Sequence, residues 1–186
     1  ENNTYEVLGR GPYQPIPIPG SRGLAARFAM DFGDNRIFFL ARDGVYQQVG
    51  LQQTKLTGAI DPFFQGQTIN SILPISEANI GQCRLKHFPS PTGGMVVLLY
   101  PESGQTTPNR RLVLKKSPIT GEYTDVFIDD MTGVNMRALA VDYEENQLLA
   151  AGDNSRIYRL ERDDLNADDS VALEWQMQTK SLHQGF

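Results

Sequence analysis

Short apolar runs separated by polar turns recur along the chain, and this pattern predicts β-strands. Residues 141–160 read as strand, polar turn, apolar strand, polar turn and strand, and residues 30–46 repeat that order. Asp31 corresponds to Asp142 and Tyr46 to Tyr158, with turns matching turns. A looser copy spans residues 83–115. Recurrence of one unit at intervals of about 55 residues predicts a repeat architecture.

The second strand of each unit is apolar at every position. These strands are residues 37–40, 96–99 and 148–151. A half-exposed strand alternates, whereas a strand covered on both faces need not. The intervening segments are turn material and leave no room for crossover helices. The pattern therefore favours sheets tiled face to face, as in a β-propeller, over an ordinary β-sandwich or another all-β arrangement.

Each unit ends in a further β-prone segment, at residues 55–60, 123–128 and 171–178. We therefore expect an all-β, β-propeller-like fold of about three four-stranded antiparallel blades. The blades are expected near residues 23–60, 83–128 and 136–178, within one domain over 23–186. Closed propellers have roughly four to eight blades. Three blades predict either a fragment of a larger propeller or a partner on the uncovered sheets.

Two segments break the repeat. Residues 1–22 include the proline-rich run GPYQPIPIPG and predict an extended arm, because proline removes donors from a β-ladder. Residues 61–82 carry apolar residues and predict an ordered insertion that holds one short helix.

Composition narrows the function classes. The chain has 186 residues, 40% of them hydrophobic, and a net charge of −5, which gives no global attraction for nucleic acid or anionic lipid. A single cysteine, Cys83, and two histidines exclude an internal disulfide and a Cys/His zinc site. The longest apolar run, residues 95–100, is too short to cross a membrane, so we expect no membrane contact.

Candidate chemistry is sparse. Neither His87, which we expect at the end of a strand, nor His183 has a recognisable partner for base catalysis. The start of a dinucleotide fingerprint at Gly9 is followed by prolines and no helix. We therefore expect no enzyme activity and no catalytic, cofactor-binding or metal-binding residues.

Two loops resemble known motifs. The spacing of Asp164, Asn166 and Asp168 resembles a calcium loop, but the required glycine and bidentate glutamate are replaced by Asp169 and Trp175. A solvated loop is expected there. The run SPITGEYT, residues 117–124, resembles the Asp-box hairpin of bacterial sialidases without its aspartate, and it predicts a hairpin and no site.

Four basic residues, Arg110, Arg111, Lys115 and Lys116, bracket one predicted strand. Arg111 and Lys115 should face the same way, since side chains alternate along a strand. They form a candidate patch for a polyanion such as DNA. The alternative is that they protect a strand edge from aggregation.

An ordered series of turns carries a family resemblance. It comprises the Arg-Asp-Gly-Val-Tyr run at residues 42–46, Gly-Asp-Asn at 152–154 before Ile157-Tyr158, and Thr179-Lys180. Over roughly residues 25–185 the chain resembles the β-propeller part of phage tail-hub proteins, the packaged-DNA stabilisation proteins of short-tailed phages.

The resemblance implies a structural virion protein of a phage tail or neck, assembled in the host cytoplasm. Such a hub or adaptor would form a homo-oligomer, contact portal or adaptor and tail-tip subunits, and help retain packaged DNA. The alternative function is a carbohydrate-binding or sialidase-like β-propeller, in which Trp175, Tyr46 and Tyr158 would contact a glycan.

Overall fold

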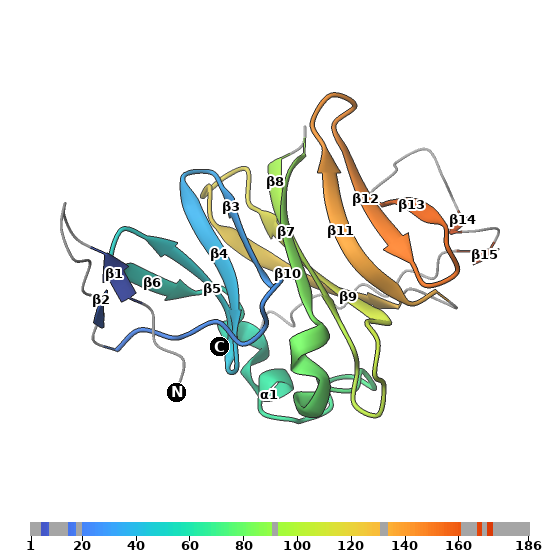
Figure 1. The fold of residues 1–186 in the computed structure, drawn as a ribbon, viewed down its shortest axis with the longest axis horizontal. Coiled ribbons are helices and arrows are strands. Elements are labelled where there is room, and N and C mark those ends of the chain that lie inside the picture. The colour runs from blue at the N-terminus through green and yellow to red at the C-terminus, as the bar shows by residue number, and fades with distance from the viewer. Residues whose placement is uncertain are drawn as a thin grey trace, which may run out of the picture.

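The chain folds into three antiparallel β-sheets that stand side by side, with few helices (Figure 1). In this computed structural model the backbone is described for residues 5–7, 15–17, 20–90, 93–130, 134–160, 167–168 and 171–172. Side chains are described for residues 20–89, 93–129 and 134–160. The expected all-β class is confirmed. None of the helices in these described residues is long and apolar enough to cross a membrane.

The first sheet has the order β3-β4-β5-β6. Its strands are β3 (Met30–Gly33), β4 (Arg36–Ala41), β5 (Gly44–Val49) and β6 (Gln52–Lys55). The β3–β4 turn places Asp34 and Asn35 at φ 50° and 57°. Two successive residues of positive φ are typical of the tight hairpin turn whose twist matches that of its strands.

The second sheet has the order β10-β9-β8-β7 and the third the order β11-β12-β13. The second comprises β7 (Arg84–Ser90), β8 (Gly93–Tyr100), β9 (Arg110–Lys116) and β10 (Tyr123–Asp130). The third comprises β11 (Met136–Asp142), β12 (Gln147–Gly152) and β13 (Ile157–Leu160). Every sheet is thus a meander of strands that are consecutive in the sequence.

Two small ribbons lie outside these sheets. β1 (Tyr5–Val7) pairs with β2 (Pro15–Pro17), and β14 (Ala167–Asp168) with β15 (Val171–Ala172). The remainder of the predicted arm over residues 1–19, and most of the predicted strand over 171–178, lie outside the described residues.

The segment between the first two sheets holds the described helices, which lie at one end of the sheets (Figure 1). They are η1 (Gly58–Ile60), α1 (Asp61–Phe64) and η2 (Glu77–Gln82). Pro62 occupies the first turn of α1, where its missing N–H costs no hydrogen bond. Phe63 and Phe64 are buried and pack into the main core.

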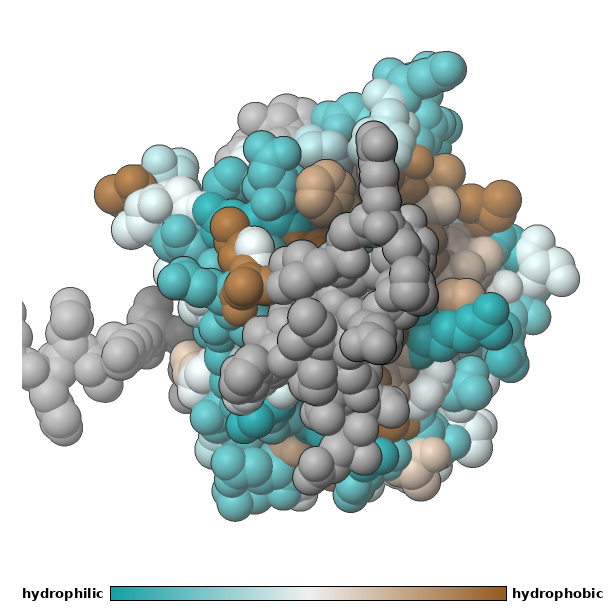
Figure 2. Space-filling model, turned by 60° about the vertical axis from the view of Figure 1, so that its left-hand side comes forward, coloured by the Kyte–Doolittle hydropathy of each residue, from teal (hydrophilic) through white to brown (hydrophobic). Residues whose placement is uncertain are grey.

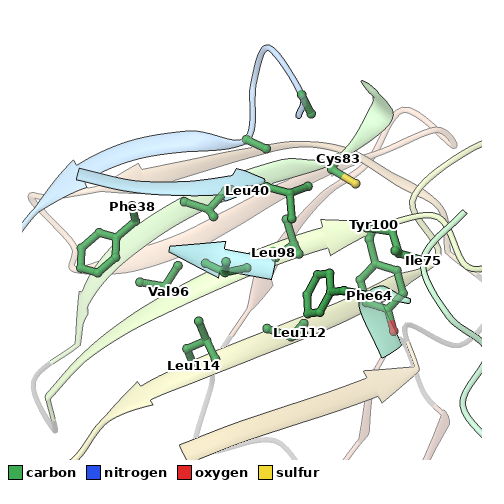
Figure 3. Packing of buried hydrophobic residues seen from close by; sticks show 14 of the residues in the cluster. Phe38, Leu40, Phe64, Ile75, Cys83, Val96, Leu98, Tyr100, Leu112 and Leu114 are labelled. Carbon is green, nitrogen blue, oxygen red and sulfur yellow. The ribbon is translucent and has the colours of Figure 1, made fainter. Parts of the chain in front are cut away.

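The main core lies between the first and second sheets. Phe38 and Leu40 from β4 meet Val96 and Leu98 from β8, with Leu112 from β9 beside them (Figure 3). The other face of the second sheet packs on the third, where Val97 and Leu148 belong to one buried cluster.

The middle sheet is therefore covered on both faces. Residues 96–99 are all fully buried, which confirms the prediction from their uninterrupted apolar pattern. The same prediction is wrong at Ile37, which is 37% exposed, and Leu149 and Ala151 are only partly buried. These residues lie on the outer faces of the end sheets, where burial is uneven: Phe39 and Ala41 share the face of Ile37 but are buried in a small cluster with Tyr46.

The first strands of the three sheets are neighbours: β3 lies beside β7, and β7 beside β11. The Leu85 amide donates to the Phe28 carbonyl at 3.1 Å, just before β3 begins. On the other side, Arg84 Nε donates to the Arg137 carbonyl at 3.0 Å. In each sheet the later strands lie progressively farther from these first strands.

Of the predicted fourth strands, one is present in the structure and another is not. The strand expected over residues 123–128 is present as β10. The strand expected over residues 55–60 is wrong, because β6 ends at Lys55 and residues 58–60 form η1. The Thr57 hydroxyl accepts the Val45 amide at 3.0 Å, so a side chain takes the place of a ladder partner there.

Candidate functional site

The four basic residues predicted as a polyanion patch lie on β9, and alternation divides them between its two faces. Arg111 and Lys115 share the face of Val113, which packs toward the third sheet. Arg110 and Lys116 share the other face, toward the first sheet. The structure therefore does not bring the four together on one surface.

Most of these basic groups have a carboxylate partner. Arg110 Nε lies 2.8 Å from Glu102 Oε2, and Arg111 forms an ion pair with its cross-strand neighbour Asp129. Lys116 Nζ lies 2.7 Å from Asp34 Oδ2. Lys115 Nζ lies over the ring of Phe127, 5.3 Å from its centroid.

A polar network that we did not predict lies between the first two sheets, with a buried half and a partly exposed half. It joins Asp34 in the β3–β4 turn, His87 on β7, Lys116 at the end of β9 and Tyr123 at the start of β10. His87 and Tyr123 are buried inside an otherwise apolar contact between sheets. The sequence predicted His87 at the end of a strand, and this prediction is wrong, because His87 lies in the middle of β7.

The hydrogen bonds of the network run in one direction. The Tyr123 hydroxyl donates to Asp34 Oδ2 at 2.9 Å, and Lys116 Nζ donates to the same oxygen at 2.7 Å. His87 Nε2 lies 2.9 Å from the Tyr123 oxygen. Because that hydroxyl proton already points to Asp34, the neutral imidazole carries its own proton on Nε2 and donates it to Tyr123.

The surroundings keep this histidine neutral. Burial lowers the pKa of His87, and the carboxylates of Asp34 and Asp31 offset that effect only in part. The 3.8 Å approach of His87 Nε2 to Asp34 Oδ2 is therefore not an ion pair at neutral pH. The imidazole stacks on the Phe38 ring, with centroids 5.3 Å apart and planes 2° from parallel.

Asp34 is the charged group at the centre. Burial alone would raise the pKa of Asp34, but hydrogen bonds from Lys116 and Tyr123 outweigh it, and the pKa lies below its usual value. Burial, reinforced by the hydrogen bond to Asp34, raises the pKa of Tyr123. The network at neutral pH thus consists of an ionised carboxylate, an ammonium, a neutral phenol and a neutral imidazole.

Two glycines make room for the network. A Cβ on Gly33 would lie 2.0 Å from His87 Nδ1, and one on Gly94 would lie 2.6 Å from the Tyr123 oxygen. Both contacts are far inside van der Waals distance. The absence of side chains at these positions lets the imidazole and the phenol meet between the sheets.

Further polar pairs continue the contact between the two sheets. Asp31 accepts the His87 amide at 2.9 Å and Lys86 Nζ at 3.1 Å. Nearer the surface, Arg36 donates to Gln47 at 2.7 Å and to Glu122 at 3.0 Å. The polar contacts therefore act as a row of cross-links from one sheet to the next.

The contacts of this network suit it to holding the first two sheets together. A general base must reach a substrate proton, whereas the imidazole is buried, stacked on Phe38 and hydrogen-bonded to Tyr123. In residues 20–89, 93–129 and 134–160 there is no cluster of three His, Cys, Asp or Glu side chains arranged to hold a metal. The network fixes the alignment of the first two sheets.

The outer face of the first sheet carries an exposed apolar stripe of Met30, Phe32 and Ile37, which are 52%, 65% and 37% exposed. Phe32 and Ile37 are cross-strand partners. Phe38 and Leu40 point into the main core, so the alternating residues point away from it. Figure 2, which turns the side of the first sheet forward, shows hydrophobic surface among hydrophilic surface there.

The remaining sequence motifs are placed as follows. The run over residues 117–124 forms the expected hairpin between β9 and β10, where the Ser117 hydroxyl accepts the amides of Ile119 and Thr120 at 3.3 Å. Asp163, Asp164 and Asp169 of the acidic loop lie outside the described residues. For Asp168 only the backbone is described, as part of β14.

The aromatic residues considered for a glycan site do not form one surface in the described part of the chain. Tyr46 is buried against Phe39, with ring centroids 5.8 Å apart, and Tyr158 packs beside the contact between the second and third sheets. Trp175 and His183 lie outside the described residues.

The chain was compared with models of known protein families and with curated proteins, and neither comparison found a match.

Proposed function

We propose that this protein is a structural component of a phage tail or neck, a hub or adaptor that acts through protein–protein contacts and catalyses no reaction. The observation that carries the proposal is the apolar stripe of Met30, Phe32 and Ile37, which is exposed on the outer face of an end sheet. Exposed apolar surface on a sheet face is typical of an interaction site. The turn series at residues 42–46 and 152–158 supports the tail-hub family.

We propose further that the three sheets are propeller blades. Each is a meander of consecutive strands, and the first strands β3, β7 and β11 are neighbours. Both features are typical of blades arranged around an axis. Sheet-to-sheet contact then explains why the apolar runs of the central strands extend over four residues.

The partner of the stripe is a second copy of the chain, docked through the outer face of the third sheet. That face is also largely apolar: Ala138 and Ala140 are exposed, Ala151 pairs with Ala138, and Ile157, the partner of Ala151 on β13, is 74% exposed. Two exposed apolar faces, one at each end of the row of sheets, can cover each other in such a contact. Two copies joined in this head-to-tail manner would bring six sheets together, which lies within the range of closed propellers, roughly four to eight blades.

Light scattering after size-exclusion chromatography tests this contact. The chain is expected to associate in a concentration-dependent way, and Phe32→Asp is expected to be monomeric. The matched control is Ile119→Asp, which changes an equally apolar residue that is 93% exposed at a hairpin tip. A monomer at every concentration, or equal association of both variants, overturns the second copy as partner.

The assignment to the virion has its own test. Gold-labelled antibody against this chain should decorate the tail or neck of purified phage particles. We place the protein in the virion after assembly in the host cytoplasm, beside portal or adaptor and tail-tip subunits, where it would help retain packaged DNA. Particles that carry no label would overturn this location without affecting the self-association test.

A further inference from the structure

Two arginines contact one exposed aromatic ring next to the line of first strands. The guanidinium carbons of Arg27 and Arg84 lie 5.2 Å and 4.9 Å from the centroid of the Phe28 ring. Phe28 is 54% exposed, Arg27 is exposed and Arg84 is half-buried. Stacking on an aromatic ring holds a guanidinium in place while leaving its edge donors available.

Arg84 is positioned by main-chain carbonyls. Its Nε donates to the Arg137 carbonyl at 3.0 Å, and its Nη1 donates to the carbonyls of Gln82 and Cys83 at 2.8 Å and 2.9 Å. Carbonyl oxygens orient the guanidinium but do not neutralise its charge. The exposed residue Arg137 itself lies on β11, directly beside this contact.

Within the described part of the chain, the positive charge of Arg27 and Arg84 has no carboxylate partner. Among residues 20–89, 93–129 and 134–160, no carboxylate lies within ion-pair distance of Arg27 or Arg84. On β9, by contrast, Arg111 and Lys116 each face a carboxylate. In a chain with a net charge of −5, fixed positive charge without a counter-charge is a local feature that calls for an anion.

We propose that Arg27, Phe28 and Arg84 form a binding site for the phosphodiester backbone of a nucleic acid. Arg27, and Arg84 through Nη2, can donate to phosphate oxygens and match their charge, while Nε and Nη1 of Arg84 stay on the carbonyls. The exposed Phe28 ring and the guanidinium planes add surfaces on which an unpaired base stacks. The site does not depend on the proposed function, because an isolated chain would bind as well as one inside a particle.

Fluorescence anisotropy tests the site with a labelled single-stranded DNA oligonucleotide and with the duplex of the same sequence. Arg27→Ala is expected to weaken binding about tenfold and to make the slope of log affinity against log salt shallower by about one. The control Arg159→Ala removes the same charge from an exposed residue of β13 and should change affinity little.

Tighter binding of the single strand assigns a role to base stacking, and equal binding of both DNAs assigns the site to the backbone alone; either result supports the proposal. Arg84→Lys keeps the charge but loses the planar stack, and it should weaken the single strand more than the duplex. Circular dichroism and the unfolding midpoint verify that each variant is folded. No binding by the unmodified chain at low salt, or equal losses for Arg27→Ala and Arg159→Ala, overturns the proposal.

Discussion

The Tyr123 hydroxyl donates a hydrogen bond to Asp34 Oδ2 across 2.9 Å of space and 89 positions of sequence. This bond joins the start of the last strand of the second sheet to the first turn of the first sheet. His87 and Lys116 approach the same two groups, so one pair of residues organises the polar contact between the sheets. Stability should therefore respond to small changes at this contact.

The hydroxyl of Tyr123 can be removed without changing the shape of the ring. Tyr123→Phe leaves the buried His87 and the partly exposed Asp34 with one partner fewer, and we expect it to lower the free energy of unfolding by about 1–3 kcal/mol. Urea unfolding followed by fluorescence measures the change. Tyr143→Phe is the matched control, because Tyr143 is largely exposed. Equal midpoints for both variants would contradict a structural role of the network.

Acid should destabilise the fold in two stages. The folded-state pKa of His87 lies below the value of about 6.5 expected in the unfolded chain, so the unfolded state binds the proton first. This contribution is fully present above pH 6.5 or so and is lost as the pH falls, by at most about 1.4 kcal/mol per pH unit. The lowered pKa of Asp34 acts in the same direction below about pH 4, where the unfolded carboxyl is protonated first.

Urea midpoints measured from pH 8 to pH 3 test both stages. His87→Gln should remove the decline that begins as the pH falls below about 6.5, where the unfolded imidazole takes up its proton, and keep the decline due to Asp34 at lower pH. A variant that still loses stability over the upper range would assign that loss to another group.

Gly33 should tolerate no side chain. A Cβ there would lie 2.0 Å from His87 Nδ1, and the imidazole has no room to move because it stacks on Phe38. We expect Gly33→Ala to cost roughly 1–3 kcal/mol of stability, as for other overpacked sites. Gly58→Ala is the control, since no atom lies within 4 Å of the position that a Cβ would take there. Thermal unfolding compares the two, and similar midpoints would refute the steric explanation.

Cys83 should report on unfolding. Burial raises the pKa of its thiol to about 12, so almost no thiolate is present at pH 8. We expect slow alkylation by iodoacetamide under native conditions and fast alkylation in urea beyond the unfolding midpoint. Mass spectrometry counts the modified fraction, and rapid native labelling would show that the main core opens more readily than its packing indicates.

Local patterns in the sequence predicted the sheets well. The uninterrupted apolar run at residues 96–99 predicted a strand covered on both faces, and all four residues are fully buried. The equally apolar Ile37 is 37% exposed, whereas Phe39, on the same face of β4, is buried with Ala41 and Tyr46. Which positions of an end strand are covered depends on the segments that pack on its outer face, and the apolar pattern of the strand does not encode those contacts.

The polar network could not have been predicted from the sequence. His87, Tyr123 and Asp34 lie far apart in the sequence and come together only because the two sheets pack on each other. No motif or regular spacing links their positions. The only local signal was the presence of Gly33 and Gly94 beside hairpin turns, and glycine at a turn usually has a simpler explanation. For the same reason the grouping of Arg27 with Arg84 around Phe28 was not predicted.

The meander order of the strands has a consequence for how such a chain can change length. In each of the three main sheets, the ladder hydrogen bonds join strands that are consecutive in the sequence. Neighbouring sheets, by contrast, contact each other mainly through packed side chains and a few hydrogen bonds such as that of Tyr123 with Asp34. Duplication or deletion of one stretch would therefore leave the ladders of the others intact. Relatives of this protein should differ in size by whole sheets, with the greatest variation where an end sheet exposes its outer face.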